Sequence, residues 1–394
     1  MKALSKIAAG VSPSATLAVS ALAKKMKAEG KDVIGFGAGE PDFATPDRIS
    51  YAGVRAICDG KTRYTPAAGM IELRQAICDR AKADYGLEYE PTQAVVASGA
   101  KHMVYIALAA LVDPGDEVIV PSPYWVSYYE MVRLFGGVPV VVNVSEEQGF
   151  QLTPEQLEHA ITDKTKAIIL NNPSNPTGAV YPKEALKAVA DVCVKHDLYI
   201  ISDEIYDKLV YDGVPFTSVA ALSDEIKAHT ILINGVSKTY AMTGWRVGFL
   251  LMSDAAYIKE MAKLNEGLVS CVSSFSQVAA AEAQHHAQRA AQKDQCTDHH
   301  NGTQQKTHHR RRTSGRAILF GCHGNQERAA DKADDLRAEI LNGCSGVQFE
   351  RACRVADETG HADCHVGRVA RHGQKHDQKS DDHTGQGQLP CFVE

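Results

Sequence analysis

Short apolar runs alternate with longer helix-like segments along roughly the first 283 residues. Runs such as 166–170 and 198–202 are almost wholly apolar, which is typical of strands buried on both faces of a sheet. The helix-like segment 182–196 has a proline in its first turn, where the missing N–H costs nothing. The alternation predicts an α/β fold with a mostly parallel sheet covered by helices. We expect strands at 94–97, 117–120, 138–142, 166–170, 198–202, 231–234 and 247–252, and helices at 101–111, 125–135, 153–161 and 182–196.

The pattern changes after Ala283. Twelve of the 16 histidines follow this point, no tryptophan or tyrosine does, and glutamine, arginine and aspartate become frequent. Such a composition buries too little apolar surface to offset the entropy of ordering, so we expect this tail to be mostly disordered or weakly folded. We therefore expect an N-terminal arm and small-domain segment at 1–45, a large ligand-binding domain at 46–283 and an atypical tail at 284–394.

The totals narrow the class of protein. With 394 residues, 44% of them hydrophobic and 23% charged, the chain is long enough for two or more globular domains. The net charge of −6 gives no reason to expect a nucleic acid or a membrane as partner, and no apolar run is long enough to span a bilayer. No secretory signal is evident, so we expect a cytoplasmic protein whose ten cysteines are thiols.

Residues 237–248 form the most informative segment. They place Ser237, Lys238 and Arg246 just past the predicted strand 231–234. A lysine sheltered from water can lose its proton and form an imine, and a serine with an arginine can hold a phosphate. These are the two features that pyridoxal phosphate (PLP) requires of a protein. Most isolated Ser-Lys pairs belong to a turn with exposed basic side chains. The residues at the other strand ends must therefore decide between a PLP site and a plain turn.

Four further segments follow predicted strands, and each has a plainer alternative. Residues 98–102 offer small residues and a helix start to an anion, or form only a tight turn. Asn175 lies in a stiff, proline-containing loop suited to holding a ring hydroxyl, although as a bare turn such a loop is common. Asp203 would need a cationic partner, such as a protonated pyridine nitrogen, or it caps a helix. Trp125 can stack on a flat cofactor or pack in the core.

These segments share one position in the predicted fold. In an open parallel sheet, ligands bind beyond the carboxyl ends of the strands. The following residues all lie at or just beyond such ends and together predict a single site: Ser98, Trp125, Asn175, Asp203 and Lys238.

The strings Ser-Asp-Glu-Ile-Tyr at 202–206, Asn-Pro-Thr-Gly at 175–178 and Ser-Lys-x-x-x-Met-Thr-Gly-Trp-Arg at 237–246 resemble the class I, fold type I PLP-dependent aminotransferases. The chain looks close to the bacterial aspartate aminotransferases, and the similarity covers roughly its first 283 residues, about seven-tenths of the chain. The resemblance implies that Lys238 forms the imine and that Ser237 and Arg246 hold the phosphate. It makes Asp203 the partner of the pyridine nitrogen and Tyr206 the ligand of the ring hydroxyl.

The resemblance also assigns the remaining contacts. It implies that Asn175 serves both cofactor and substrate and that Trp125 lies beside the ring and the substrate carboxylate. Gly39 matches a glycine in a substrate-contacting loop. Tyr64 matches a tyrosine that reaches the phosphate of a neighbouring subunit, which implies a homodimer with shared active sites. The backbone around the phosphate matches Gly99, Ala100 and Lys101.

The implied reaction is ping-pong amino transfer through the Lys238 imine, from an L-amino acid, expected to be aspartate, to a 2-oxo acid, expected to be 2-oxoglutarate. An aromatic aminotransferase or a β-lyase on the same fold is an alternative, as is an inactive PLP-binding remnant. A nucleotide-binding protein is disfavoured because no Gly-x-Gly-x-x-Gly or Walker string follows a strand.

The tail departs from the family. The family's C-terminal Gly-Ala-Phe-Tyr-like segment and its Arg-Ile-Ser-Tyr-like stretch, whose arginine binds the substrate α-carboxylate, have no counterpart here. We hypothesise that the tail is read from a shifted frame. A genuine divergent tail with a metal site around 361–365 is the weaker alternative, because the spacing matches no recognised zinc site, and we expect no metal.

Overall fold

The computed structural model describes residues 2–10, 15–35, 37 and 39–285. The chain divides into two units, Met1–Arg337 and Ala338–Glu394, and every described residue belongs to the first. The expectations for the tail and for a metal site at 361–365 fall outside the described residues. The division into domains at 45 and 283 therefore stays a prediction.

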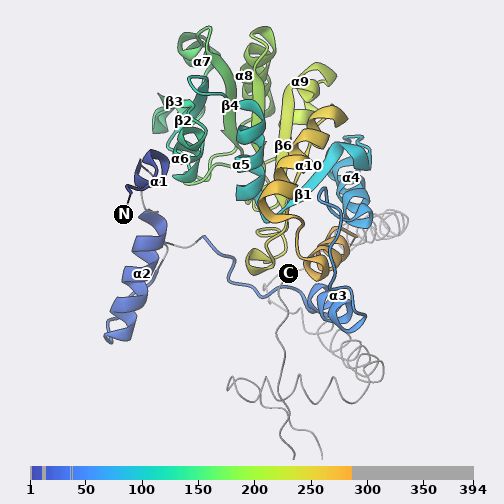
Figure 1. The fold of residues 1–394 in the computed structure, drawn as a ribbon. Helices are drawn as coiled ribbons and strands as arrows, with labels where there is room; N and C mark the ends of the chain where they lie inside the picture. The colour runs from blue at the N-terminus through green and yellow to red at the C-terminus, as the bar shows by residue number, and fades with distance from the viewer. Residues whose placement is uncertain (1, 11–14, 36, 38, 286–394) are drawn as a thin grey trace, which may run out of the picture. The chain divides into compact units, whose positions relative to one another are not determined.

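A seven-stranded sheet forms the centre of the described fold, in the order β1-β7-β6-β5-β4-β2-β3 (Figure 1). Every neighbouring pair is parallel except the two that β7 makes with β1 and β6. The mostly parallel sheet predicted from the apolar runs is thus confirmed. The strands are β1 (Ala94–Ala97), β2 (Glu117–Ser122), β3 (Val138–Asn143), β4 (Thr165–Asn171), β5 (Tyr199–Asp203), β6 (Thr230–Gly235) and β7 (Gly248–Leu251).

Helices follow most strands, as the alternating pattern predicts. The predicted helices agree with the observed ones to within two residues at each end, and α7 begins after a Thr153 cap with proline as its first residue. The labelled helices are α1 (Lys6–Gly10), α2 (Ala15–Ala28), α3 (Asp47–Cys58), α4 (Ile71–Tyr85), α5 (Ala100–Leu111), α6 (Ser127–Leu134), α7 (Pro154–Ala160), α8 (Lys183–Lys195), α9 (Asp224–His229) and α10 (Ala255–Val269), with short 3-10 turns at Pro91–Gln93, Glu146–Gln148, Val219–Ala221 and Thr243–Trp245. Residues 274–285 are also helical. In the described range, none of these helices combines the length and the apolar character needed to cross a bilayer.

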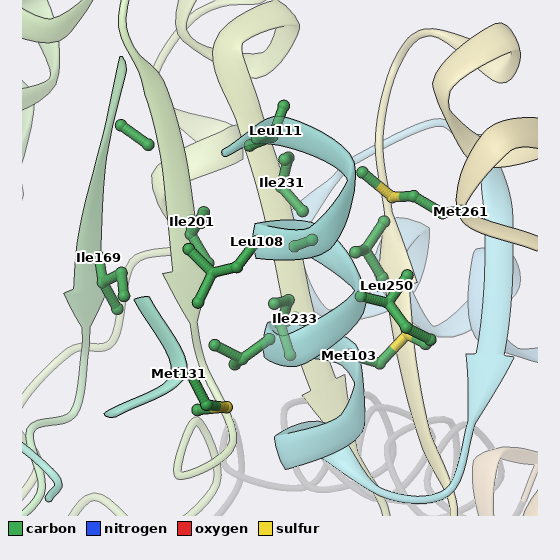
Figure 2. Close-up of a cluster of buried hydrophobic side chains, with 14 of the residues drawn as sticks. Met103, Leu108, Leu111, Met131, Ile169, Ile201, Ile231, Ile233, Leu250 and Met261 are labelled. Atoms are coloured by element: carbon green, nitrogen blue, oxygen red, sulfur yellow. The ribbon is translucent and has the colours of Figure 1, made fainter. Parts of the chain in front are cut away.

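One face of the sheet packs against α5, α6 and α10. Figure 2 shows Met103 and Leu108 of α5 lying over Ile201 and Ile233, with Met261 of α10 beside them. All five side chains are almost completely buried, and each such burial stabilises the fold by roughly 1.5–3 kcal/mol. The continuous apolar strands of the sequence therefore have partners on this side.

The opposite face carries the alternate residues of the same strands. On β4, Ala167 and Ile169 belong to the α5 side, whereas Ile168 and Leu170 pack into a second cluster with α7, α8 and α9. A third cluster joins β1, β6 and β7 to α3 and α4. Burial on both faces explains why these strands show no alternation between apolar and polar residues.

The strand register brings the predicted site segments to one edge. Asn171 at the end of β4 pairs with Asp203 at the end of β5, and Gly235 at the end of β6 pairs with Gly248 at the start of β7. Ala97 at the end of β1 pairs with the same Gly248. The antiparallel β7 thus places its first residue where its neighbours place their last.

Candidate active site

Lys238 follows β6 and is partly buried. Its Nζ donates a hydrogen bond to the carbonyl oxygen of Gly39 and lies 5.9 Å from the centre of the Tyr206 ring. Burial lowers the pKa of the ammonium group, Glu40 opposes this shift and Arg246 adds to it. A lysine with a lowered pKa supplies the uncharged amine that nucleophilic and general-base chemistry needs. The structure brings the predicted Gly39 and Tyr206 to this amine.

Asp203 ends β5 and is only 3% exposed. Its Oδ2 accepts a hydrogen bond of 2.6 Å from the Tyr128 hydroxyl, and its Oδ1 accepts one of 3.3 Å from the backbone N–H of Ile205. Burial raises the pKa of the carboxyl, and the two hydrogen bonds oppose that rise. The residues that directly follow Asp203 form a turn and not a helix, so the helix-cap alternative is wrong.

Asn175 and Tyr206 meet beside this carboxylate. The amide of Asn175 donates to the phenolic oxygen of Tyr206 at 3.2 Å. Burial and the charge of Asp203 raise the pKa of Tyr206, and the Asn175 hydrogen bond lowers it. Asn171 fixes the loop, because its Oδ1 accepts from the Asn175 N–H at 2.6 Å and its amide donates to the Asp203 carbonyl at 2.9 Å.

At the start of α5, glycine residues let the backbone and Arg246 approach one another closely, and we call this region the candidate phosphate cup. Gly99 precedes this helix with φ 96°, and a Cβ there would come within 2.6 Å of the Arg246 guanidinium. A Cβ on Gly248 would come within 2.3 Å of the Ala100 nitrogen. Arg246 is held by hydrogen bonds to the carbonyl oxygens of Thr243 at 2.9 Å and Ser98 at 3.1 Å.

Positive charge gathers at the same point. Burial, with Arg246 second, lowers the pKa of both Lys101 and His102. The Lys101 ammonium lies 4.7 Å from the centre of the Trp125 ring, and Trp125 contacts Tyr128 edge-on with ring centres 5.2 Å apart. A guanidinium that lowers the pKa of two neighbouring basic groups beside a helix start forms a site suited to a multiply charged anion.

Two of the predicted site residues, Ser237 and Tyr64, differ in how far they are exposed to solvent. Ser237 is 8% exposed and lies one residue before Lys238. Tyr64 is 90% exposed, and its predicted role depends on a second subunit. The structure therefore gathers the other predicted residues at one sheet edge and leaves the role of Tyr64 as a prediction.

Sequence reasoning missed Tyr128 and Asn171, both of which contact Asp203. Tyr128 lies on α6, three residues beyond Trp125, in a segment that the sequence predicts only as a helix. Asn171 directly precedes the Asn-Pro pair of the loop. Its place as the last residue of β4, paired with Asp203, was the signal that could have identified it.

These residues fit PLP. A carboxylate that is buried without a salt bridge to any described residue calls for a cationic partner, and a pyridinium nitrogen is one. The glycine at position 99 lets Arg246 lie close to the start of α5, where a phosphate would bind, and Lys238 offers an amine. Asp203 would hold the ring nitrogen, Tyr206 and Asn175 the ring oxygen, and the Gly99 cup with Arg246 the phosphate.

The fold and this arrangement define a PLP-dependent enzyme of fold type I. The family model for aminotransferase class I and II matches residues 31–326. The chain belongs to the class I and II aminotransferases, which use pyridoxal phosphate.

Individual relatives agree with this family. The chain is 50% identical to the aspartate aminotransferase of Bacillus subtilis over 280 residues, 71% of each chain. It is 51% identical to that of Geobacillus stearothermophilus over the same share. Among solved structures, the aspartate aminotransferase of Thermus thermophilus with maleate superposes with a TM-score of 0.70 at 44% identity, covering 74% of this chain and 75% of that one.

Proposed function

We propose that the protein transfers the amino group of L-aspartate to a 2-oxo acid, with 2-oxoglutarate as the acceptor. The observation that carries this proposal is the buried Asp203, which forms no salt bridge with any described residue, at the same sheet edge as Lys238, whose pKa burial lowers. The names of the relatives support aspartate as the donor.

The bound cofactor would supply an aldehyde that links to amines and a cationic ring that withdraws electrons from the substrate Cα–H bond. Lys238 would hold the cofactor through that aldehyde, and its Nζ would carry the substrate Cα proton as general acid and base. Burial favours its uncharged form for this task. Asp203 would keep the ring nitrogen protonated, and the hydrogen bond from Tyr128 opposes the rise that burial causes in the pKa of this carboxyl.

Asn175 and Tyr206, which are hydrogen-bonded to each other, would hold the ring oxygen. Ser237, Arg246 and the backbone of Gly99, Ala100 and Lys101 would hold the phosphate. Trp125 would cover the ring, and Gly39 would line the substrate side.

The assembly and location are further parts of the proposal. We infer a homodimer in the cytoplasm, in which Tyr64 of one subunit completes the phosphate site of the other. Its 90% exposure leaves the Tyr64 ring free to do so. We also keep the hypothesis that the tail is read from a shifted frame. Resequencing the gene across the Ala283 codon tests it, and an intact frame with this tail confirmed by mass spectrometry would refute it.

A half-reaction experiment tests the function. Purified protein loaded with the cofactor and given aspartate without an acceptor should release about one equivalent of oxaloacetate per site. Adding 2-oxoglutarate should then allow continuous turnover. Release of pyruvate and sulfide or ammonia from cysteine, with no amino transfer, would assign the site to a β-lyase instead.

A further inference from the structure

A buried ion pair lies behind the candidate active site. The Arg80 guanidinium of α4 donates to Oδ2 of Asp207 at 2.6 Å, and the two side chains are 3% and 0% exposed. The Tyr85 hydroxyl donates to the same oxygen. Burial lowers the pKa of Arg80, but Asp207, Tyr240, Tyr85 and Asp84 together outweigh burial and raise it. Arg80 therefore stays charged inside the protein.

Asp207 joins the two segments that carry the reactive groups. It directly follows Tyr206 in the turn after β5. Its other oxygen, Oδ1, accepts a hydrogen bond of 3.3 Å from the hydroxyl of Thr239, which directly follows Lys238 in the loop after β6. One carboxylate thus connects the neighbour of Tyr206 with the neighbour of Lys238.

Arg80 holds the same two segments from the other side. Its guanidinium lies 5.7 Å from the centre of the Tyr240 ring, two residues beyond Lys238. Its Nε donates to Asp84 at 3.0 Å, and its Nη1 donates to Gln284 at 3.3 Å. A planar guanidinium that is held by three acceptors in different directions has one orientation only.

The cluster is electrically balanced. Lys208, the residue after Asp207, lies 3.1 Å from Asp84, so two cations face two anions. Taking charges out of water is costly, and such a pair adds little to stability compared with apolar packing. A buried ion pair can instead specify one geometry, and here that geometry belongs to the lysine and tyrosine loops.

We infer that Asp207 and Arg80 are positioning residues that fix Lys238 against Tyr206 in the orientation the reaction requires. This inference rests on the proposed function. Neither residue touches the candidate cofactor contacts directly; they act through Thr239, Tyr240 and the backbone that links them to Lys238.

The test measures the pKa of Lys238 in the full chain without cofactor, by competitive acetylation across a pH series and peptide mass spectrometry. Thr239→Val removes only the hydroxyl that reaches Asp207, and Arg80→Lys keeps the charge but loses the planar fork. Asp207→Asn removes the charge. Loosening the loop exposes Lys238 to water, so the labelling midpoint should rise by roughly half a pH unit or more in each variant.

Ile77→Val is the matched control, because it weakens packing on the same helix α4 without touching the cluster. It should lower the Tm and leave the Lys238 midpoint unchanged. If Asp207→Asn fails to fold, the Lys238 midpoints of Thr239→Val and Arg80→Lys decide whether the inference holds. An unchanged midpoint in every folded variant, even with a lower Tm, would overturn the inference and leave the pair a purely structural one.

A second readout separates this inference from the proposed function. Each chain is incubated with pyridoxal phosphate and reduced with borohydride, and the fraction of Lys238 modified is measured by peptide mapping. The positioning inference predicts a severalfold lower fraction in the variants than in the parent. A shifted midpoint with no modification even of the parent would support the positioning of Lys238 and contradict the proposed function. Equal modification of parent and variants, with equal midpoints, would contradict the positioning alone.

Discussion

Tyr128 and Asp203 are 75 positions apart in the sequence, yet the phenolic oxygen lies 2.6 Å from Oδ2 of the carboxylate. Both side chains are almost fully buried. Burial raises the pKa of Asp203, and this hydrogen bond is the first influence that opposes the rise. Tyr128 therefore controls how readily Asp203 carries the negative charge that a protonated pyridine nitrogen needs.

Tyr128→Phe should raise the pKa of Asp203 further, so that the carboxyl loses its proton less readily. A hydrogen bond to a charged group contributes about 1.5–3 kcal/mol, so we expect kcat to fall by about tenfold or more and the acid limb of the pH profile to move to higher pH. Tyr89→Phe is the control, because it removes a buried hydroxyl that has no hydrogen-bond partner among the described residues. Equal pH profiles for parent and Tyr128→Phe would show that Tyr128 does not influence Asp203.

Lys238→Ala should remove both the covalent attachment of the cofactor and the proton carrier. Turnover should fall by at least about 10²–10⁴-fold, the usual contribution of a general acid–base. The measurement is steady-state oxaloacetate formation together with visible absorbance. If the variant still absorbs visible light and borohydride still links the cofactor covalently to it, the cofactor is attached to another lysine.

Gly248→Ala should distort the phosphate cup, because its Cβ would lie 2.3 Å from the Ala100 nitrogen. Overpacking of this kind costs about 1–3 kcal/mol of unfolding free energy. Affinity for pyridoxal phosphate, measured by fluorescence titration, should fall as well. Gly244→Ala is the matched control, since nothing lies within 4 Å of its Cβ position. Identical affinities for the two variants would contradict the proposed cup.

Glu204 gives the fold a pH dependence of its own. Its Oε1 accepts hydrogen bonds from Ser202, Ser218 and the Val219 N–H, while no described residue partners its Oε2. Burial raises its pKa from 4.5 to about 8. The folded state therefore binds the proton more tightly than the unfolded state, so the stabilisation is complete below pH 4.5 and is lost as the pH rises through about 8.

Glu204→Gln should remove this dependence. The amide keeps the acceptor for the three donors but does not titrate near neutral pH. The Tm of the variant should exceed that of the parent by more at pH 8.5 than at pH 5. A difference between the two Tm values that stays constant with pH would contradict the assignment.

The tail predicts weak binding of dicarboxylic substrates, because the family's carboxylate-binding arginine has no counterpart in it. A chimera joining residues 1–283 to the C-terminal part of the Bacillus subtilis aspartate aminotransferase should bind aspartate roughly tenfold or more tightly than this chain. Cofactor attachment to Lys238 should be the same in both. Turnover of this chain equal to that of the chimera at low aspartate would contradict the account of the tail.

The sequence predicted the sheet well for a physical reason. Strands such as β4 are buried on both faces, so their apolar runs are unbroken and their ends are marked by polar residues such as Asn171 and Asp203. The rule that ligands bind at the carboxyl ends of parallel strands then gathered the candidate residues at one edge.

Contacts between distant segments could not be predicted in the same way. Arg80 and Asp207 are 127 positions apart, and in the sequence each is one charged residue among many. Tyr128 looked like any aromatic residue of an amphipathic helix. Their pairing depends on how α4 and α6 pack on the sheet, which no local pattern encodes.

The most direct test of the account is borohydride reduction of the purified, cofactor-loaded chain, followed by peptide mapping of the modified residue. We predict visible absorbance that reduction abolishes and a single modified peptide that carries the cofactor on Lys238. A folded protein that stays colourless with excess pyridoxal phosphate, or that carries the adduct on a different lysine, would contradict the account.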